Sequence, residues 1–194
     1  MTDAPALPPP APDILDRAVE AALRLAQDRP WDGVTLLDIA HEAGIPFADL
    51  YARAPGKGAL LWRLARRFDR EALSRAEADM GPEAEVHDRL FEAVMARLEV
   101  LAPHRAALIA IGRSLGPLAL APRLPMTARA LLEAAGIDTG GRRGAARVAA
   151  MTVVWARTLQ VWRDDEGALN RTMAEIDKRL RQMRERLRLV GAGF

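Results

Sequence analysis

The sequence predicts an all-α fold, with a small three-helix N-terminal unit followed by a larger helical bundle. Apolar residues recur at spacings of three and four through most of the 194-residue chain. No segment alternates apolar and polar residues with period two, and β-branched and aromatic residues are sparse, which disfavours strands. Glycine and proline interrupt the pattern at intervals that suit helices, and nine helices are expected.

The N-terminal third predicts a tail and the first four helices. Five prolines in residues 4–12 exclude a helix, so residues 1–12 are expected to form a disordered tail. Gly44 ends one helix and Pro46 opens the next, because glycine suits a left-handed helix end and proline a first turn. The helices expected here span residues 13–29, 35–43, 46–54 and 57–79.

The rest of the chain predicts five more helices. A proline-broken connection is expected over residues 116–125 and a glycine-rich one over 136–144. The second lacks the ending of a phosphate-binding loop, and no strand precedes it. Two domains are therefore expected, at 13–57 and 58–194. The remaining helices are expected over residues 86–101, 103–115, 126–135, 143–163 and 168–190.

Composition excludes several classes of protein. Without cysteine, the chain has no disulfide, thiolate metal site or cysteine nucleophile. The three histidines lack the spacing of a metal pair on one helix, and no motif suggests catalysis, so we expect no enzyme, metal or cofactor. No apolar run approaches about 18 residues and no secretory signal is evident, which favours a cytoplasmic protein.

Residues 34–61 carry the most specific local signal: a short helix, a three-residue turn containing glycine, and a second short helix. This is the geometry of a helix-turn-helix, whose second helix fits the major groove of DNA. The segment resembles the N-terminal domain of the TetR family of transcriptional regulators, and the resemblance covers residues 13–70. It is carried by Thr35, Asp38-Ile39-Ala40, Ala43-Gly44-Ile45, Leu50-Tyr51, Lys57 and Leu60-Leu61.

That resemblance implies a DNA-binding surface. Thr35, Tyr51 and Lys57 would meet the phosphate backbone, and Phe47 and Asp49 would face base edges. The sequence departs from the family pattern where Pro46 opens the recognition helix and where an aspartate faces DNA. Residues 1–60 also hold five basic residues against nine acidic ones, a net charge of −4 that supplies little affinity for phosphate. The implied DNA-binding residues are Thr35, Pro46, Phe47, Asp49, Tyr51 and Lys57.

The C-terminal part is also similar to the lipid-binding accessory protein of ubiquinone biosynthesis, a TetR-like fold without DNA recognition. The similarity rests on residues 95–98, 101–103, 131–136 and 155–180. Both resemblances imply an apolar cavity between bundle helices, although the same inward residues also suit a packed core. The residues expected to line that cavity are Phe91, Met95, Leu98, His104, Leu108, Ile111, Met151 and Trp155.

The last helix is basic and amphipathic. Ile176, Leu180, Met183, Leu187 and Val190 form one apolar stripe surrounded by arginines. The TetR resemblance implies dimerisation through the last two helices, whereas a basic amphipathic helix over 176–190 could also lie on an anionic membrane. The residues expected at the dimer interface are Thr158, Trp162, Met173, Ile176 and Leu180.

The sequence thus favours a homodimeric regulator, which the family resemblance implies is a repressor. It would bind a palindromic operator and respond to a small apolar effector. The alternative is a lipid or quinone-precursor carrier that acts at a membrane surface without binding DNA.

Overall fold

The computed structural model describes residues 13–79, 84–165 and 169–194, and all regular structure in these residues is helical. The all-α class is therefore confirmed, while the expected tail over residues 1–12 lies outside the described part. Nine helices were expected. The described residues contain eight α-helices of at least eight residues and one short helix, α3, of seven residues. The α-helices are α1 (Ile14–Asp28), α2 (Leu36–Ala43), α3 (Phe47–Arg53), α4 (Lys57–Asp79), α5 (Val86–Leu101), α6 (Arg105–Leu120), α7 (Leu124–Ala134), α8 (Gly141–Asp164) and α9 (Asn170–Leu189). Three 3-10 turns, η1 (Trp31–Gly33), η2 (Ala102–His104) and η3 (Ala121–Arg123), complete the order.

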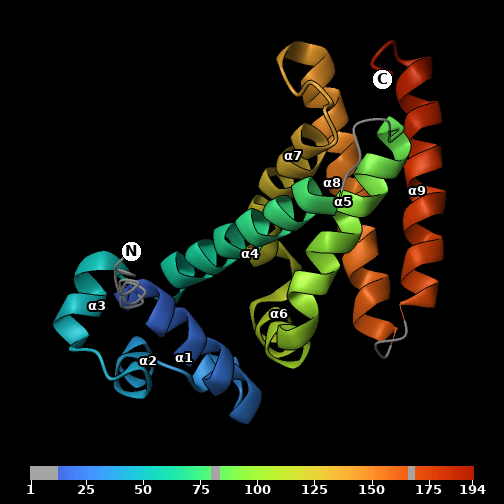
Figure 1. Cartoon of the computed structure of the whole chain (residues 1–194). Helices are drawn as coiled ribbons and strands as arrows, with labels where there is room; N and C mark the ends of the chain where they lie inside the picture. Colours follow the sequence, from blue (N-terminus) through green and yellow to red (C-terminus); the bar gives the residue numbers. More distant parts are fainter. Residues whose placement is uncertain (1–12, 80–83, 166–168) are drawn as a thin grey trace, which may run out of the picture.

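Helix α4 joins the two parts of the molecule (Figure 1). It has 23 residues, and at 1.5 Å per residue it spans about 35 Å. Helices α1 to α3 gather at its N-terminal end, whereas α5 and α7 pack along its C-terminal part and α8 and α9 lie beyond them. Helix α6 also packs against α1, so the N-terminal unit contacts the bundle through two helices.

Small residues on α1 allow the N-terminal helices to approach closely. Ala18, Ala21 and Ala22 are buried against α2 and α4, and Leu50 anchors the short α3 in the same core. Trp31, in η1, is the largest fully buried side chain of this unit. The three-helix unit is thus held by tertiary packing, since helices as short as α2 and α3 are unstable alone.

The bundle largely follows the expected helix boundaries, with three shifts. Helix α6 continues to Leu120, but its backbone leaves helical geometry at Gly116 (φ 71°, ψ 171°), where the proline-broken connection was expected to begin. Helix α7 begins two residues early, because Pro125 fits its first turn. Helix α8 begins at Gly141, and Gly144 lies so close to Thr139 that a Cβ there would be 2.0 Å from the Thr139 carbonyl carbon.

Candidate nucleic-acid interface and interior binding region

The turn between α2 and α3 is fixed by backbone and side-chain hydrogen bonds. Gly44 takes the left-handed conformation (φ 62°, ψ 42°), and the next amide, of Ile45, donates to the Ala40 carbonyl at 2.9 Å. Arg17 of α1 donates to the carbonyls of Ala43 and Gly44, at 2.5 and 2.9 Å. A guanidinium at the C-terminal end of α2 also complements the helix dipole. These contacts set the angle at which α3 leaves the turn.

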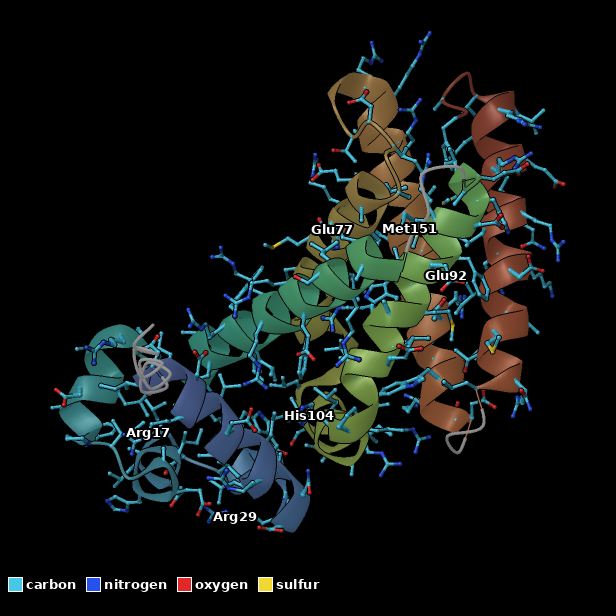
Figure 2. The ribbon with its side chains drawn as sticks, in the orientation of Figure 1. Arg17, Arg29, Glu77, Glu92, His104 and Met151 are labelled. Carbon is cyan, nitrogen blue, oxygen red and sulfur yellow. The ribbon has the colours of Figure 1, made fainter. Side chains whose placement is uncertain are left out.

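Thr35 begins α2 with a complete capping box. Its hydroxyl accepts a hydrogen bond from the Asp38 amide at 3.1 Å, and its own amide donates to the Asp38 carboxylate at 2.8 Å. The Thr35 amide, and the Thr35 hydroxyl that donates to the same carboxylate at 2.7 Å, lower the pKa of Asp38 to about 2, with a smaller contribution from Arg29 at 3.0 Å. Figure 2 shows Arg17 and Arg29 near opposite ends of α1, where they fasten the two ends of α2. The exposed position of Thr35 suits the predicted phosphate contact.

Helix α3 presents an aromatic pair to solvent. The side chains of Phe47 and Tyr51 are 43% and 54% exposed, and their ring centroids lie 5.9 Å apart. Pro46 is the N-cap of the helix, and Asp49 and Arg53 are exposed on it. The helix therefore exposes both residues that the sequence placed at base edges, Phe47 and Asp49. The charged side chains of α3 are one carboxylate and one guanidinium, so the helix itself has no net charge.

Lys57, predicted to reach phosphate, already has protein partners. Its ammonium donates to the carbonyls of Trp31 at 2.8 Å and Val34 at 2.6 Å, and it lies 4.7 Å from the centre of the Trp31 ring. An ammonium has three donors, so one remains for a phosphate. Lys57 thus ties the first turn of α4 to η1, and the DNA contact stays a prediction.

Three acidic residues at the start of the N-terminal unit form ion pairs with α4. Arg63 of α4 contacts Asp13, the N-cap of α1, at 3.3 Å and Asp16 at 3.1 Å, and Arg67 contacts Glu20 at 2.6 Å. These ion pairs join α1 to α4 across the base of the N-terminal unit. A groove of about 420 Å³ lies beside them, lined by Asp16, Arg17, Glu20, Arg24, Ala43 and Arg67.

The residues expected to line an effector cavity lie in closely packed parts of the bundle. Leu98 and Met151 are fully buried, and Met95, Ile111 and Trp155 are also buried, whereas Phe91 and Leu108 are half-buried. His104 stacks on Phe68, with ring centroids 5.3 Å apart, at the end of α5 nearer to α1 (Figure 2). Neither of the two best-defined hollows among the described residues is lined by these side chains. An effector there would have to open the packing, and the site stays a prediction.

Sequence reasoning missed a buried polar cluster between α4, α5 and α7. Arg97 is 5% exposed and donates from Nε to Asp69 at 2.8 Å, while the Thr127 hydroxyl donates to the same carboxylate at 3.1 Å. Burial lowers the pKa of the Arg97 guanidinium, and the charge of Asp69 opposes that shift. The signal available in the sequence was a single arginine within the apolar run of α5.

Four of the five residues expected at a dimer interface are buried in the single chain. Thr158, Trp162, Ile176 and Leu180 pack within the protomer, and only Met173, 40% exposed, is on the surface. An arrangement in which those four contact a second copy therefore does not fit this fold. An interface on α8 and α9 would instead use outward residues such as Met173 and Val153.

The apolar stripe of α9 also packs inside the protomer. Met183 and Leu187 are buried with Ile176 and Leu180, and only Val190, at the end of the stripe, is exposed. The sequence suggested that the apolar stripe of residues 176–190 could lie on a membrane. Because that stripe is buried in the protomer, it is not a free membrane-binding face. No helix within the described residues has the length and apolar character that a membrane span requires. Among the described residues, no three His, Asp or Glu side chains gather into a metal site.

Comparisons with known proteins agree with this geometry. Residues 18–64 match the family model of the bacterial regulatory proteins, tetR family. A TetR transcriptional regulator from Nitrosomonas europaea ATCC 19718 is similar over 89% of this chain and 98% of its own, with a TM-score of 0.70 and 21% identity. One from Rhodococcus sp. RHA1 is similar over 88% and 94%, with a TM-score of 0.65 and 19% identity.

Other solved structures share the fold, including the transcriptional regulator FadR from Bacillus subtilis. It covers 87% of this chain and 96% of its own, with a TM-score of 0.55 and 15% identity. None of the curated proteins compared with the sequence matches it. The model match spans α1, the helix-turn-helix and the start of α4, which is the unit whose geometry is described above. Residues 18–64 therefore match the helix-turn-helix domain of the tetR family model, and the chain shares its fold with solved TetR transcriptional regulators over 88% and 89% of its length.

Proposed function

We propose that the protein is a ligand-responsive transcriptional regulator that binds a palindromic operator as a homodimer. The observation that carries the proposal is the rigid presentation of Phe47 and Tyr51 on α3, within a domain that matches the family model. The solved structures that resemble the chain are transcriptional regulators, which supports a role in binding rather than catalysis. We favour repression, although one similar structure is the dihydroxyacetone kinase operon activator DhaS.

The structure suggests a route from the bundle to the DNA surface. Helix α4 holds Asp69 of the buried cluster near its middle and Lys57 of the η1 contact at its start. An effector that separates α4 from α7 would therefore move the end of α4 that holds the helix-turn-helix. If the effector binds the state with misplaced recognition helices more tightly, it lowers operator occupancy by that difference in affinity.

An apolar acyl compound is our candidate class of effector. FadR from Bacillus subtilis, which shares the fold, was solved in complex with stearoyl-CoA. Met95, Ile111 and Trp155 would form apolar walls once the bundle opens. At 15% identity the two proteins share the fold alone, so the effector class stays a proposal.

We propose dimerisation through the outward faces of α8 and α9, with Val153 and Met173 in the contact. Val153 lies in the middle of α8 and is 58% exposed, so its side chain is available for contact with a second copy. Val153→Glu should convert the dimer to a monomer in light scattering, whereas Leu189→Glu, at the exposed end of α9, should not. A dimer that survives Val153→Glu would place the interface elsewhere.

The first test is binding to the DNA upstream of the protein's own gene, measured across a salt series beside an unrelated duplex of equal length. Tyr51→Ala should weaken binding to the upstream duplex by about 10-fold or more, and Met126→Ala, an exposed apolar residue on α7, is the matched control. No preference for the upstream duplex at low salt would count against self-regulation.

One observation keeps the lipid carrier as a second candidate. The arginines near the helix-turn-helix are paired with carboxylates or carbonyls, so few remain for phosphate. A carrier would retain apolar lipid on purification and sediment with anionic liposomes through the exposed Leu189 and Val190. Deletion of residues 189–194 should then abolish sedimentation, while a regulator would show no liposome binding to lose.

A further inference from the structure

The groove beside the ion pairs of the N-terminal unit has no part in the functions assigned so far. It is formed by residues of α1, the end of α2 and α4 and encloses about 420 Å³, a volume typical of small-molecule sites. Apart from one alanine, its lining consists of charged side chains. The lining residues are Asp16, Arg17, Glu20, Arg24, Ala43 and Arg67. A groove of this size and composition suits a small charged ligand.

One guanidinium of the lining has no carboxylate partner among the described residues. The other charged side chains form ion pairs: Asp16 with Arg63 at 3.1 Å, Glu20 with Arg67 at 2.6 Å, and Arg24 with Glu42 at 2.9 Å. Arg63 also contacts Asp13, which is not part of the lining. Arg17 instead donates to the carbonyls of Ala43 and Gly44, which do not balance its positive charge. The groove therefore has an uncompensated positive charge at Arg17.

The three arginines of the lining keep hydrogen-bond donors that no described residue accepts. A guanidinium has five N–H donors. Among the described contacts, Arg17 donates from Nη2 alone, Arg24 from Nε alone and Arg67 from Nη1 alone. The Arg67 side chain is 18% exposed, so its charge is less screened by water and salt than that of a surface arginine. The groove thus offers donors from two helices to one ligand.

We propose that this groove binds a small organic phosphate, with its phosphate group at Arg17. A phosphate presents several acceptor oxygens and can accept hydrogen bonds from more than one guanidinium, while its negative charge balances Arg17. The organic part of the ligand would occupy the rest of the groove. This proposal does not rest on the proposed function, because it needs neither an operator nor an effector in the bundle.

The position of the groove favours a dissolved phosphate over the phosphates of DNA. Arg67 lies ten residues along α4 from Lys57, which is about 15 Å at the rise of an α-helix. Arg17 contacts the C-terminal end of α2, whereas Thr35 caps its N-terminal end. The groove is therefore separated along both helices from Thr35 and Lys57, two of the residues predicted to meet the DNA backbone.

The test is calorimetric titration at neutral pH and low ionic strength, in a buffer without phosphate. The three probes have similar size and differ in charge: glycerol 3-phosphate, glycerate and glycerol. Because a phosphate monoester carries close to two negative charges at this pH, glycerol 3-phosphate should bind at least about 10-fold more tightly than glycerate. Glycerol should not bind. No binding of glycerol 3-phosphate, or equal binding of glycerate, would overturn the proposal.

Variants of the lining should change the binding of glycerol 3-phosphate in opposite directions. Arg17→Gln removes the uncompensated charge and should weaken binding by about 10-fold. Arg24→Gln should weaken it by about 3-fold, and Glu20→Gln, which removes a negative charge from the lining, should strengthen it by about 3-fold. Since Arg17 also holds the turn after α2, its Tm is measured first, and the other two variants decide the test if Arg17→Gln does not fold.

The matched controls alter an ion pair of the same kind outside the groove. Arg75 and Glu71 of α4 contact each other and are each 46% exposed, similar to Arg24 at 54% and Glu20 at 45%. Arg75→Gln and Glu71→Gln should leave the binding of glycerol 3-phosphate unchanged. If they change it as much as the groove variants do, the probe responds to the overall charge of the protein and the site is wrong.

A competition experiment separates the two sources of phosphate. A short unrelated DNA duplex, added at the same phosphate concentration as glycerol 3-phosphate, should not displace the bound probe. Displacement by the duplex would assign the free donors of the groove to the DNA backbone and would refute a site for a dissolved phosphate.

Discussion

Replacement of Lys57 by methionine should destabilise the N-terminal unit, in addition to any effect on DNA. The ammonium donates to two carbonyls, of Trp31 and Val34, and lies over the Trp31 ring. A hydrogen bond to a charged group is worth about 1.5–3 kcal/mol, and a cation–π contact at a partly exposed site about 0.5–1 kcal/mol. Because Lys57 is half-buried, water can replace part of these interactions. We therefore expect Lys57→Met to lower the free energy of unfolding by about 3 kcal/mol.

In a chain of this length, a loss of about 3 kcal/mol lowers Tm by about 6–12 °C. The measurement is thermal unfolding followed by the fluorescence of the four tryptophans, of which Trp31 lies beside the lost contact. Arg53→Met is the control, because Arg53 is exposed and has no hydrogen bond or ion pair among the described residues. It should change stability by less than about 0.5 kcal/mol.

The result that would refute the reasoning is an unchanged Tm for Lys57→Met. If that variant has the same Tm as the wild type and nevertheless loses operator affinity, Lys57 acts only in DNA binding and its carbonyl contacts contribute no stability. A fall in Tm with intact operator binding at low temperature would show the reverse, a structural lysine whose third donor does not touch phosphate.

Four further outcomes follow from the same geometry. Asp38, whose pKa is about 2 against an ordinary 3.8, stabilises the fold above pH 4, and this contribution is lost as the pH falls toward 2; Asp38→Asn should therefore unfold more easily than wild type at pH 6 and equally at pH 2 in urea titrations. A double-mutant cycle of Arg67→Ala and Glu20→Ala should give a coupling below about 1 kcal/mol that shrinks in 1 M salt, and a salt-insensitive coupling would contradict it. Leu50→Ala should cost about 2–5 kcal/mol in urea unfolding, because it opens a cavity under the recognition helix. The logarithm of operator affinity against that of salt should have a slope of about −4, since Arg53 and one other cation give about two phosphate contacts per protomer, and a slope steeper than about −8 would mean that paired arginines are released.

The helix-turn-helix could be predicted because its signals are local. The Thr35 cap and its partner Asp38 are three residues apart, and Gly44 marks the turn by a backbone conformation that few other residues adopt. Such features depend on neighbours in the sequence and need no knowledge of the rest of the fold. The exposed positions of Phe47 and Tyr51 follow from the same local pattern, once Leu50 faces the core.

Contacts between distant segments could not be predicted in this way. The stripe through Ile176 and Leu180 showed that one face of the last helix is buried, but its spacing carries no information about the partner, which is the protomer itself. Arg97 interrupts the apolar stretch of α5, and its partner Asp69 lies 28 residues earlier on another helix. A positive charge at Lys57 suits a phosphate or a carbonyl equally, and the fold decides which is in reach.

The net charge of the N-terminal unit depends on where the unit ends, and the fold places that end differently from the sequence pattern. Counted over residues 1–60, the charge is −4, which argues against contact with DNA. The ion pairs show that the unit extends to Arg67 of α4, and over residues 13–67 eight basic residues balance eight acidic ones. The unit is therefore neutral rather than acidic, and three of its carboxylates hold α1 on α4, those of Asp13, Asp16 and Glu20. A neutral unit is not repelled by DNA, but it also gains little from counterion release. If the protein binds an operator as proposed, its affinity would come mainly from the side chains of α3 in the groove.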